Sequence, residues 1–114
     1  MKARIQRSPD HLVITLSGDF DAFVREPFLD QVQALLEQDG HHLELDLQRV
    51  GFMGSSGVGA LLKARRMCRE RGGELVLTQV SRAVRETLEL LDLTSVLPIV
   101  EDGQQARAAA GVGE

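Results

Sequence analysis

Two adjacent serines between glycines are the residues of this sequence best placed to do chemistry. Ser55 and Ser56 occupy the segment Gly54–Gly57, at the expected junction of a strand and a helix. Free backbone amides at a helix N-terminus favour negative charge, so a phosphorylated hydroxyl is electrostatically acceptable there. The glycines Gly54, Gly57 and Gly59 would let the active site of another protein approach the backbone closely.

The spacing of these residues does not match three common catalytic or nucleotide-binding motifs. A P-loop requires a lysine and a hydroxyl residue after its second glycine, but Ala60 and Leu61 follow Gly59. A dinucleotide-binding fingerprint requires a glycine where Leu62 stands, and a nucleophile elbow requires one residue more than Gly54–Gly57 provides. Two interpretations remain: a hydroxyl that can be phosphorylated, or a serine that caps the helix.

Apolar periodicity predicts the elements that must position these serines. Alternating or β-branched apolar segments predict strands, and apolar residues at helical spacing predict helices. The strands are expected at Ala3–Gln6, Leu12–Leu16, Leu43–Leu47, Glu74–Thr78 and Leu97–Val100. The helices are expected at Ala22–Gln38, at Ser56–Arg71, from the N-cap Ser81 through Leu91, and at Asp102–Ala110.

The order of these elements predicts an α/β fold. Repeated strand–helix–strand units favour a mostly parallel sheet with right-handed crossovers, and the turn at Ser8–Asp10 makes the first two strands an antiparallel hairpin. We expect Gly18–Asp21 to end the second strand, Pro27 to lie in the first turn of the first helix, and Pro98 to place the last strand at a sheet edge. One domain is expected over residues 1–110, with a C-terminal tail at 111–114.

Composition and charge limit the class of function. The 114 residues are 43% hydrophobic and 26% charged, which fits one globular domain. The net charge of −4 and the lack of Trp and Tyr argue against nucleic-acid binding, which needs a concentrated basic surface and often base-stacking aromatics. No apolar segment approaches the ~20 residues of a membrane-spanning helix. No apolar signal segment follows the basic residues of Met1–His11, so a cytoplasmic protein is expected.

Several other residues have both a functional and a structural interpretation. Asp19 and Asp21 suit turn and capping roles better than acid–base catalysis. The adjacent His41 and His42 would point to opposite faces of a strand, which argues against a metal site. The single cysteine excludes an internal disulfide, and its apolar neighbours predict burial; it is Cys68.

The second helix is strongly basic within an acidic protein. Its cations could dock an acidic surface of a partner, or they could form a solvated face whose charges suit the C-terminal end of the helix dipole. These cations are Lys63, Arg65, Arg66, Arg69 and Arg71. Phe52 and Met53, which precede the serines, could be exposed anchors for a partner, although at least one is expected in the core.

The motifs and their order along the chain resemble the STAS domain family, and within it the bacterial anti-sigma factor antagonists. The resemblance covers nearly the whole chain. It rests on the segments Leu16–Asp21, Leu45–Leu47, Val50–Leu61, Gly72–Leu75, Ser81–Val84 and Leu90–Leu93. It implies a single-domain STAS fold, with a mixed and mostly parallel sheet whose first strand is antiparallel, built from the strands and helices predicted above.

The resemblance also implies a binding switch rather than an enzyme. In this family the unphosphorylated antagonist binds an anti-sigma factor that is also a serine kinase with a histidine-kinase-like ATPase fold, and so frees the sigma factor. Phosphorylation of the antagonist by this kinase ends the binding, and a serine phosphatase restores it. No cofactor, metal ion, nucleic acid or inserted membrane segment is implied.

The family motif Asp-Ser-[Ser/Thr]-Gly-Leu assigns roles to individual residues. Ser55 matches the phosphorylated position, Ser56 is the second choice, and Gly54 replaces the usual acidic residue. Asp21 matches the acid of the family's Gly-x-x-Asp turn, which lies near the phosphorylation site. The resemblance and the basic helix together give the expected partner-binding residues: Asp21, Phe52, Met53, Gly54, Ser55, Ser56, Gly57, Val58, Lys63 and Arg66.

Two alternative functions stay open at this point. A STAS protein without regulated phosphorylation would use the same helix face permanently, as a scaffold or as a subunit of a lipid-transport complex. A serine hydrolase would need a general base, but His11, His41 and His42 have no motif relation to the serines.

Overall fold

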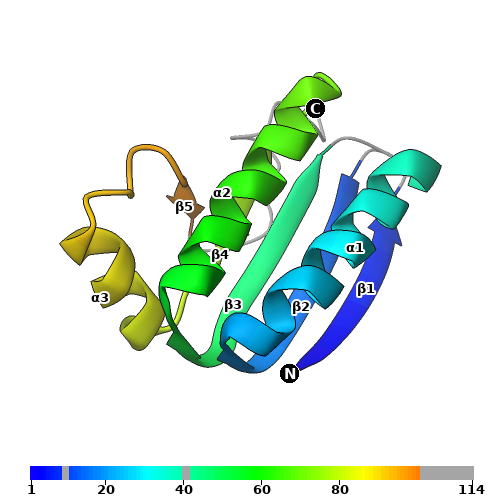
Figure 1. The fold of residues 1–114 in the computed structure, drawn as a ribbon. Helices are drawn as coiled ribbons and strands as arrows, with labels where there is room; N and C mark the ends of the chain where they lie inside the picture. The colour runs from blue at the N-terminus through cyan, green and yellow to red at the C-terminus, as the bar shows by residue number, and fades with distance from the viewer. Residues whose placement is uncertain (9–10, 40–41, 101–114) are drawn as a thin grey trace.

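The structure, a computed structural model, describes residues 1–8, 11–39 and 42–100. These residues form one mixed sheet in the order β1-β2-β3-β4-β5, in which β1 and β2 are antiparallel and the other neighbours are parallel (Figure 1). The strands are β1 (Lys2–Ser8), β2 (His11–Phe20), β3 (Leu43–Met53), β4 (Leu75–Thr78) and β5 (Ile99–Val100), and the helices are α1 (Ala22–Asp39), α2 (Ser55–Glu70) and α3 (Arg82–Leu90). The predicted α/β topology is therefore confirmed. The helix expected at 102–110 and the tail at 111–114 lie outside the described residues.

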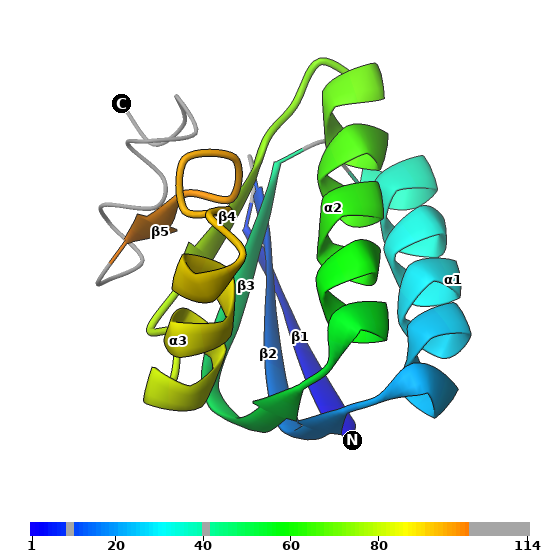
Figure 2. The same cartoon turned by 60° about the vertical axis from the view of Figure 1, so that its left-hand side comes forward.

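The helices form two separate groups around the sheet. Helices α1 and α2 lie side by side on one face, whereas α3 lies apart from them beside β5 (Figure 2). Within β3, strand β4 pairs with Leu43–Asp46 only, and α3 packs against the remainder of β3. The Ser81 hydroxyl donates to the Val50 carbonyl at 2.6 Å and accepts from the Val84 amide at 3.3 Å, which confirms Ser81 as the predicted N-cap.

The core lies between the sheet and the α1–α2 layer. Strand β2 contributes every second side chain to this core, and the apolar stripe of α1 packs against it. The rings of Phe20 and Phe28 meet edge to face, with centroids 5.1 Å apart. The buried residues of these two elements include Leu12, Ile14, Leu16, Phe28, Val32, Leu35 and Leu36. Among the described residues, no helix is long and apolar enough to cross a membrane.

Strand β3 is longer than the expected Leu43–Leu47 because two bulges change its periodicity. Residues Leu43, Leu45 and Leu47 alternate inward, but the next inward residues are Val50 and Met53. The register against β2 slips between Thr15 and Ser17 and again between Gly18 and Asp19, so β3 carries an extra residue at each place. Each bulge turns two successive residues outward, and the strand continues to the edge of the candidate site. For the same reason β2 runs through to Phe20, where the sequence predicted a break.

The first helix also begins earlier than its proline suggested. Helix α1 starts at Ala22, so Pro27 lies in its second turn rather than in its first. Proline lacks the amide that would bond to the carbonyl four residues earlier. That carbonyl belongs to Phe23, which lies at the exposed start of the helix, where water can satisfy it. The remaining boundaries agree to within one or two residues, and the short β5 takes the predicted edge position.

A close approach at Gly57 fixes the start of α2 against the sheet. A Cβ atom at this position would lie 2.7 Å from Cγ of Met53 and 2.9 Å from Cδ1 of Phe20, closer than real contacts permit. A Cβ atom at Gly59, two residues further along the helix and half-buried, would meet only the end of a flexible side chain, Nη1 of Arg25, at 3.0 Å. The missing side chain of Gly57 is therefore required by packing.

We predict that Gly57→Ala lowers the free energy of unfolding by about 1–3 kcal/mol, since the added methyl group overpacks the core. Gly59→Ala is the matched control in the same helix: Arg25 can move aside, and alanine is the better helix former, by roughly 0.5–1 kcal/mol. Urea denaturation of both variants measures the difference. Equal stability of the two variants would contradict the packing role of Gly57.

Candidate functional site

The candidate site is built where the parallel strands β2 and β3 end side by side. Phe20 and Met53 are partners in the last row of the sheet, and the Gly54 amide donates to the Phe20 carbonyl at 3.3 Å. This bond holds the loop that starts α2 against the loop that starts α1. It brings together Asp21 and Ser55, which are 34 positions apart in the sequence.

Ser55 is the first residue of α2, and its side chain is exposed. The N-cap is Gly54, with φ −86° and ψ −175°, and no side chain forms a capping hydrogen bond at this helix end. The first helical bond runs from the Val58 amide to the Gly54 carbonyl at 3.1 Å. The interpretation of Ser55 or Ser56 as the helix cap is therefore wrong. Neither hydroxyl forms a capping hydrogen bond at the start of α2, and the hydroxyl of Ser55 lies on the surface.

Asp21 is the N-cap of α1. Its Oδ1 atom accepts a hydrogen bond from the Phe23 amide at 3.0 Å, which confirms the predicted capping role. The residue is half-buried, and it directly follows Phe20, whose carbonyl accepts from the Gly54 amide. Asp21 can thus position the start of α1 and present negative charge beside the serines.

Some predicted partner-binding residues belong to the core instead. Met53 and Val58 are each only 4% exposed, so neither side chain is available at the surface. Gly57 is buried as well, and the space left by its missing side chain is filled by Phe20 and Met53 rather than by an approaching active site. Phe52 is 52% exposed, because the second bulge of β3 turns it outward. One of the two expected anchors therefore lies in the core, as predicted, and the other at the surface.

One neighbour of the serines, Arg25, and one exposed aromatic residue, Phe23, were missed in the sequence. Arg25 of α1 donates through Nη1 to the Ser56 carbonyl at 3.2 Å, across 31 positions, and Gly59 leaves room for its guanidinium group. Phe23, in the first turn of α1, is 90% exposed, which is unusual for an aromatic side chain. No local periodicity signals the contact of Arg25 with Ser56, because it depends on the pairing of β2 with β3.

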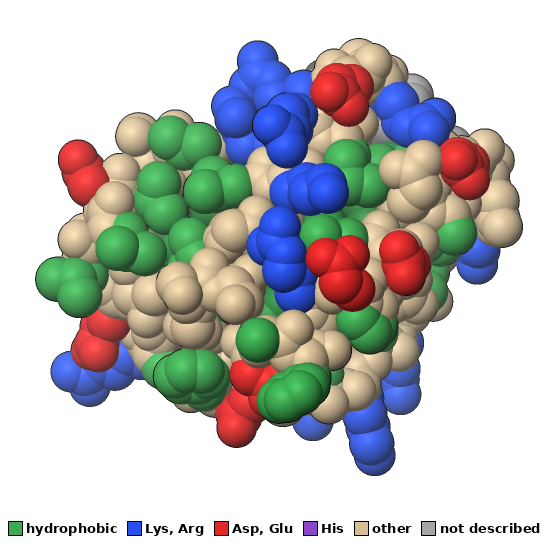
Figure 3. Space-filling model, viewed as in Figure 1, with side chains coloured by type: hydrophobic (Ala, Val, Ile, Leu, Met, Phe, Trp, Pro, Cys, Tyr) green, Lys and Arg blue, Asp and Glu red, His purple; other side chains and the backbone are tan. Residues whose placement is uncertain are grey.

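A basic groove runs along α2 from Arg25. It has a volume of about 620 Å³ and is lined by Arg25, Gly59, Leu62, Lys63, Arg65, Arg66, Arg69 and Glu70. Figure 3 shows Lys and Arg side chains in a row over α1 and α2. Arg65 and Arg69 reach Glu74 at 3.9 Å and 3.6 Å, whereas the exposed Lys63 and Arg66 form no ion pair within the described residues.

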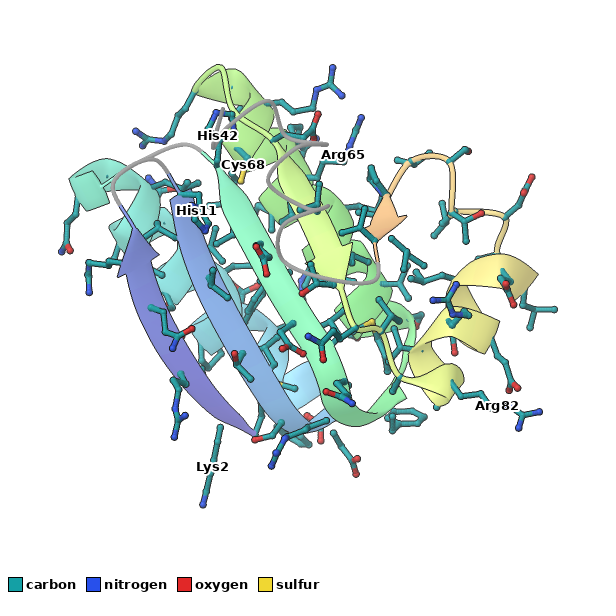
Figure 4. All side chains as sticks on the ribbon, turned by 180° about the vertical axis from the view of Figure 1, so that it is seen from behind. Lys2, His11, His42, Arg65, Cys68 and Arg82 are labelled. Carbon is teal, nitrogen blue, oxygen red and sulfur yellow. The ribbon has the colours of Figure 1, made fainter. Side chains whose placement is uncertain are left out.

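The histidines and the cysteine lie far from the serines. His11 starts β2 and His42 precedes β3, so both are at the opposite end of the sheet from Ser55 (Figure 4). Burial, together with the nearby Glu74 carboxylate, raises the pKa of the Cys68 thiol to about 12, although Arg71 opposes the shift. Neither a histidine base nor a reactive thiolate is thus available to the serines in the part of the chain described. Three metal-ligating side chains do not gather anywhere in that part, and His41 lies outside it.

Comparisons with known proteins agree with the fold. A family model described as "Mlab, STAS domain" matches residues 3–101. The anti-sigma-B factor antagonist of Listeria monocytogenes is 29% identical over 94 residues, which are 82% of this chain and 82% of that protein. The unphosphorylated form of the anti-sigma factor antagonist SpoIIAA has a TM-score of 0.80 at 21% identity, covering 99% of this chain and 100% of the other. The phosphorylated form of SpoIIAA from Bacillus has a TM-score of 0.72 at 20% identity, covering 95% of this chain and 99% of the other.

We predict that Ser55→Ala changes the free energy of unfolding by no more than about 0.5 kcal/mol, because its exposed hydroxyl takes no part in the helix cap. Ser81→Ala is the matched comparison: it removes both hydrogen bonds that fix the start of α3, and about 1–2 kcal/mol should be lost. Urea denaturation gives both values. A Ser55→Ala variant as unstable as Ser81→Ala would show that Ser55 has a structural role.

Proposed function

The chain belongs to the STAS domain family, and on this premise we propose that it is an anti-sigma factor antagonist that acts by binding rather than by catalysis. The observation that carries the proposal is the exposed hydroxyl of Ser55, which starts α2 without capping it. The relatives named as antagonists support the assignment. The partner is an anti-sigma factor, which releases its sigma factor when this protein binds in the cytoplasm.

The switch in this proposal is phosphorylation of Ser55 by the anti-sigma factor, acting as a serine kinase with a histidine-kinase-like ATPase fold. A phosphoserine carries about −1.5 to −2 charges at neutral pH. In a close interface this charge must be desolvated, and a penalty of only ~3 kcal/mol weakens binding more than a hundredfold. A serine phosphatase then removes the group and restores binding. That one relative has been solved in a phosphorylated form is consistent with this cycle.

The modification should leave the fold intact. Ser55 occupies the first position of α2, where the helix dipole interacts favourably with an anion by roughly 0.3–1 kcal/mol. The core contacts of this turn are made by Gly57 and Val58, which the Ser55 side chain does not join. Binding and stability are therefore controlled by different residues.

The proposed contact surface surrounds Ser55 and continues along the basic groove. Phe52, near the end of β3, provides an exposed aromatic ring, and aromatic side chains are enriched in protein interfaces. Asp21, Gly54 and Ser56 line the loops beside this ring, and Lys63 and Arg66 extend the surface along α2. The basic groove fits an acidic patch on the partner, which would steer association.

Gly54 supports a second candidate function. The usual acidic residue before the serine is absent, and the matching family model carries the name Mlab rather than an antagonist's name. A STAS domain that is never phosphorylated would use the same surface permanently, as a scaffold or within a lipid-transport complex. Phosphorylation of the purified protein separates the two functions.

We predict that an anti-sigma factor kinase from the source organism, incubated with ATP and this protein, adds one phosphoryl group. Intact-mass spectrometry should show the addition to the wild type and to Ser56→Ala, but not to Ser55→Ala. The two alanine variants are matched because they are adjacent and remove the same hydroxyl. Modification of the Ser55→Ala variant would show that another residue is the phosphate acceptor. If the wild type is not modified, the permanent scaffold is favoured.

We further predict that Ser55→Asp weakens binding to the anti-sigma factor at least about a hundredfold, by placing an unpaired carboxylate in the interface. Ser95→Asp adds the same charge at an exposed position outside the proposed surface and should bind like the wild type. Calorimetric titration measures both affinities, and the thermal transitions should be nearly unchanged. Full binding by Ser55→Asp would contradict the proposed switch.

A further inference from the structure

The sheet face opposite α1 and α2 carries a second concave surface. Figure 4 views the sheet from this side, with β1, β2 and β3 in front of α1. The inward residues of β2 and β3 pack toward the helices, so the alternate residues point outward here. They line a groove of about 560 Å³ whose residues are Lys2, Ala3, Arg4, Thr15, Ser17, Asp46, Gln48 and Arg49.

The strand register arranges these residues in two rows across three strands. The first row is Lys2, Ser17 and Arg49, which places a hydroxyl between two cations. The second row is Arg4, Thr15 and Asp46, which places a hydroxyl between a cation and a carboxylate. Adjacent strands lie about 4.8 Å apart, so one small molecule can touch all three members of a row.

The first bulge of β3 creates the cationic row. With regular alternation, Gln48 would point outward and Arg49 inward, but the extra residue lets both face the groove. Oδ1 of Asp46 stabilises this conformation by accepting a hydrogen bond from the backbone amide of Gln48 at 3.1 Å. The groove is therefore shaped by a specific irregularity, which often re-aims side chains at binding sites.

Charge and chemistry indicate what the groove can hold. Its lining has three cations and one carboxylate, although the whole chain has a net charge of −4. The cationic row suits a phosphate group, while Thr15, Asp46 and Gln48 can bind hydroxyl groups. No aromatic side chain lines the groove, so it offers no stacking surface for a nucleobase. Its volume lies within the range of small-molecule sites, roughly 300–1,000 Å³.

We propose that this groove binds a soluble phosphorylated polyol, such as a sugar phosphate. Lys2, Ser17 and Arg49 hold the phosphate, and the row of Arg4, Thr15 and Asp46 holds the hydroxyl groups. The site shares no residue with the surface around Ser55, so it stands independently of the proposed antagonist function.

The test is a titration of the isotopically labelled full chain, followed by amide shifts in NMR spectra. Glucose 6-phosphate should give saturable amide shifts at residues 2–4, 15–18 and 46–50. Inorganic phosphate should give weaker shifts at the cationic row, and glucose should give no shifts. The proposal would be overturned if the shifts do not saturate at millimolar glucose 6-phosphate, if they map to α2, or if glucose alone produces the same shifts. Vesicles containing phosphatidylglycerol provide a further arm: broadening of these amides by vesicles, with no response to the sugar phosphate, would replace the soluble ligand by a membrane surface.

Variants keep the test specific. Arg49→Gln and Lys2→Gln should each weaken binding of glucose 6-phosphate about tenfold, since each removes a charge-assisted contact to phosphate. Arg82→Gln, at the exposed start of α3, removes the same charge elsewhere and should bind like the wild type. Equal weakening by all three variants would indicate a net-charge effect and overturn the proposed site.

Discussion

The structure depends on the contact between Gly57 and the ends of two strands. Because a Cβ atom at Gly57 would collide with Met53 and Phe20, the first turn of α2 can lie directly on the sheet edge only with glycine there. The contact fixes the rotation of the helix, so that Val58 points into the core and Ser55 points out. The hydroxyl on which the proposed switch depends is thus exposed as a consequence of how a neighbouring glycine is packed.

This arrangement separates the residues that support the fold from those that can meet a partner. Helix α1 is capped by Asp21, α3 by Ser81, and α2 begins with the backbone of Gly54. The hydroxyl of Ser55 is consequently free of any capping role. A charge can be added at Ser55 without removing a contact that the folded state uses, which is what a reversible binding switch requires.

Much of the fold could be predicted because local patterns agree with it. A β-branched and apolar segment identified β2, period-two alternation identified the first half of β3, and helical spacing identified α1 and α2. The second half of β3 was missed because its bulges replace alternation by a period of three, at Leu47, Val50 and Met53. Arg25 was missed because its contact with Ser56 is set by the pairing of β2 with β3. The identity of the candidate serine, in contrast, came from a short motif that needs no long-range information.

The bulged half of β3 has a consequence for how surfaces of this kind can diversify. Each inward residue there is followed by two outward ones, Gln48 and Arg49, then Gly51 and Phe52. Substitutions at these outward positions need not disturb the apolar spine formed by Leu47, Val50 and Met53. Mutational drift along this single segment can therefore retune recognition at two places, the groove beside Arg49 and the surface beside Phe52, while the scaffold stays constant.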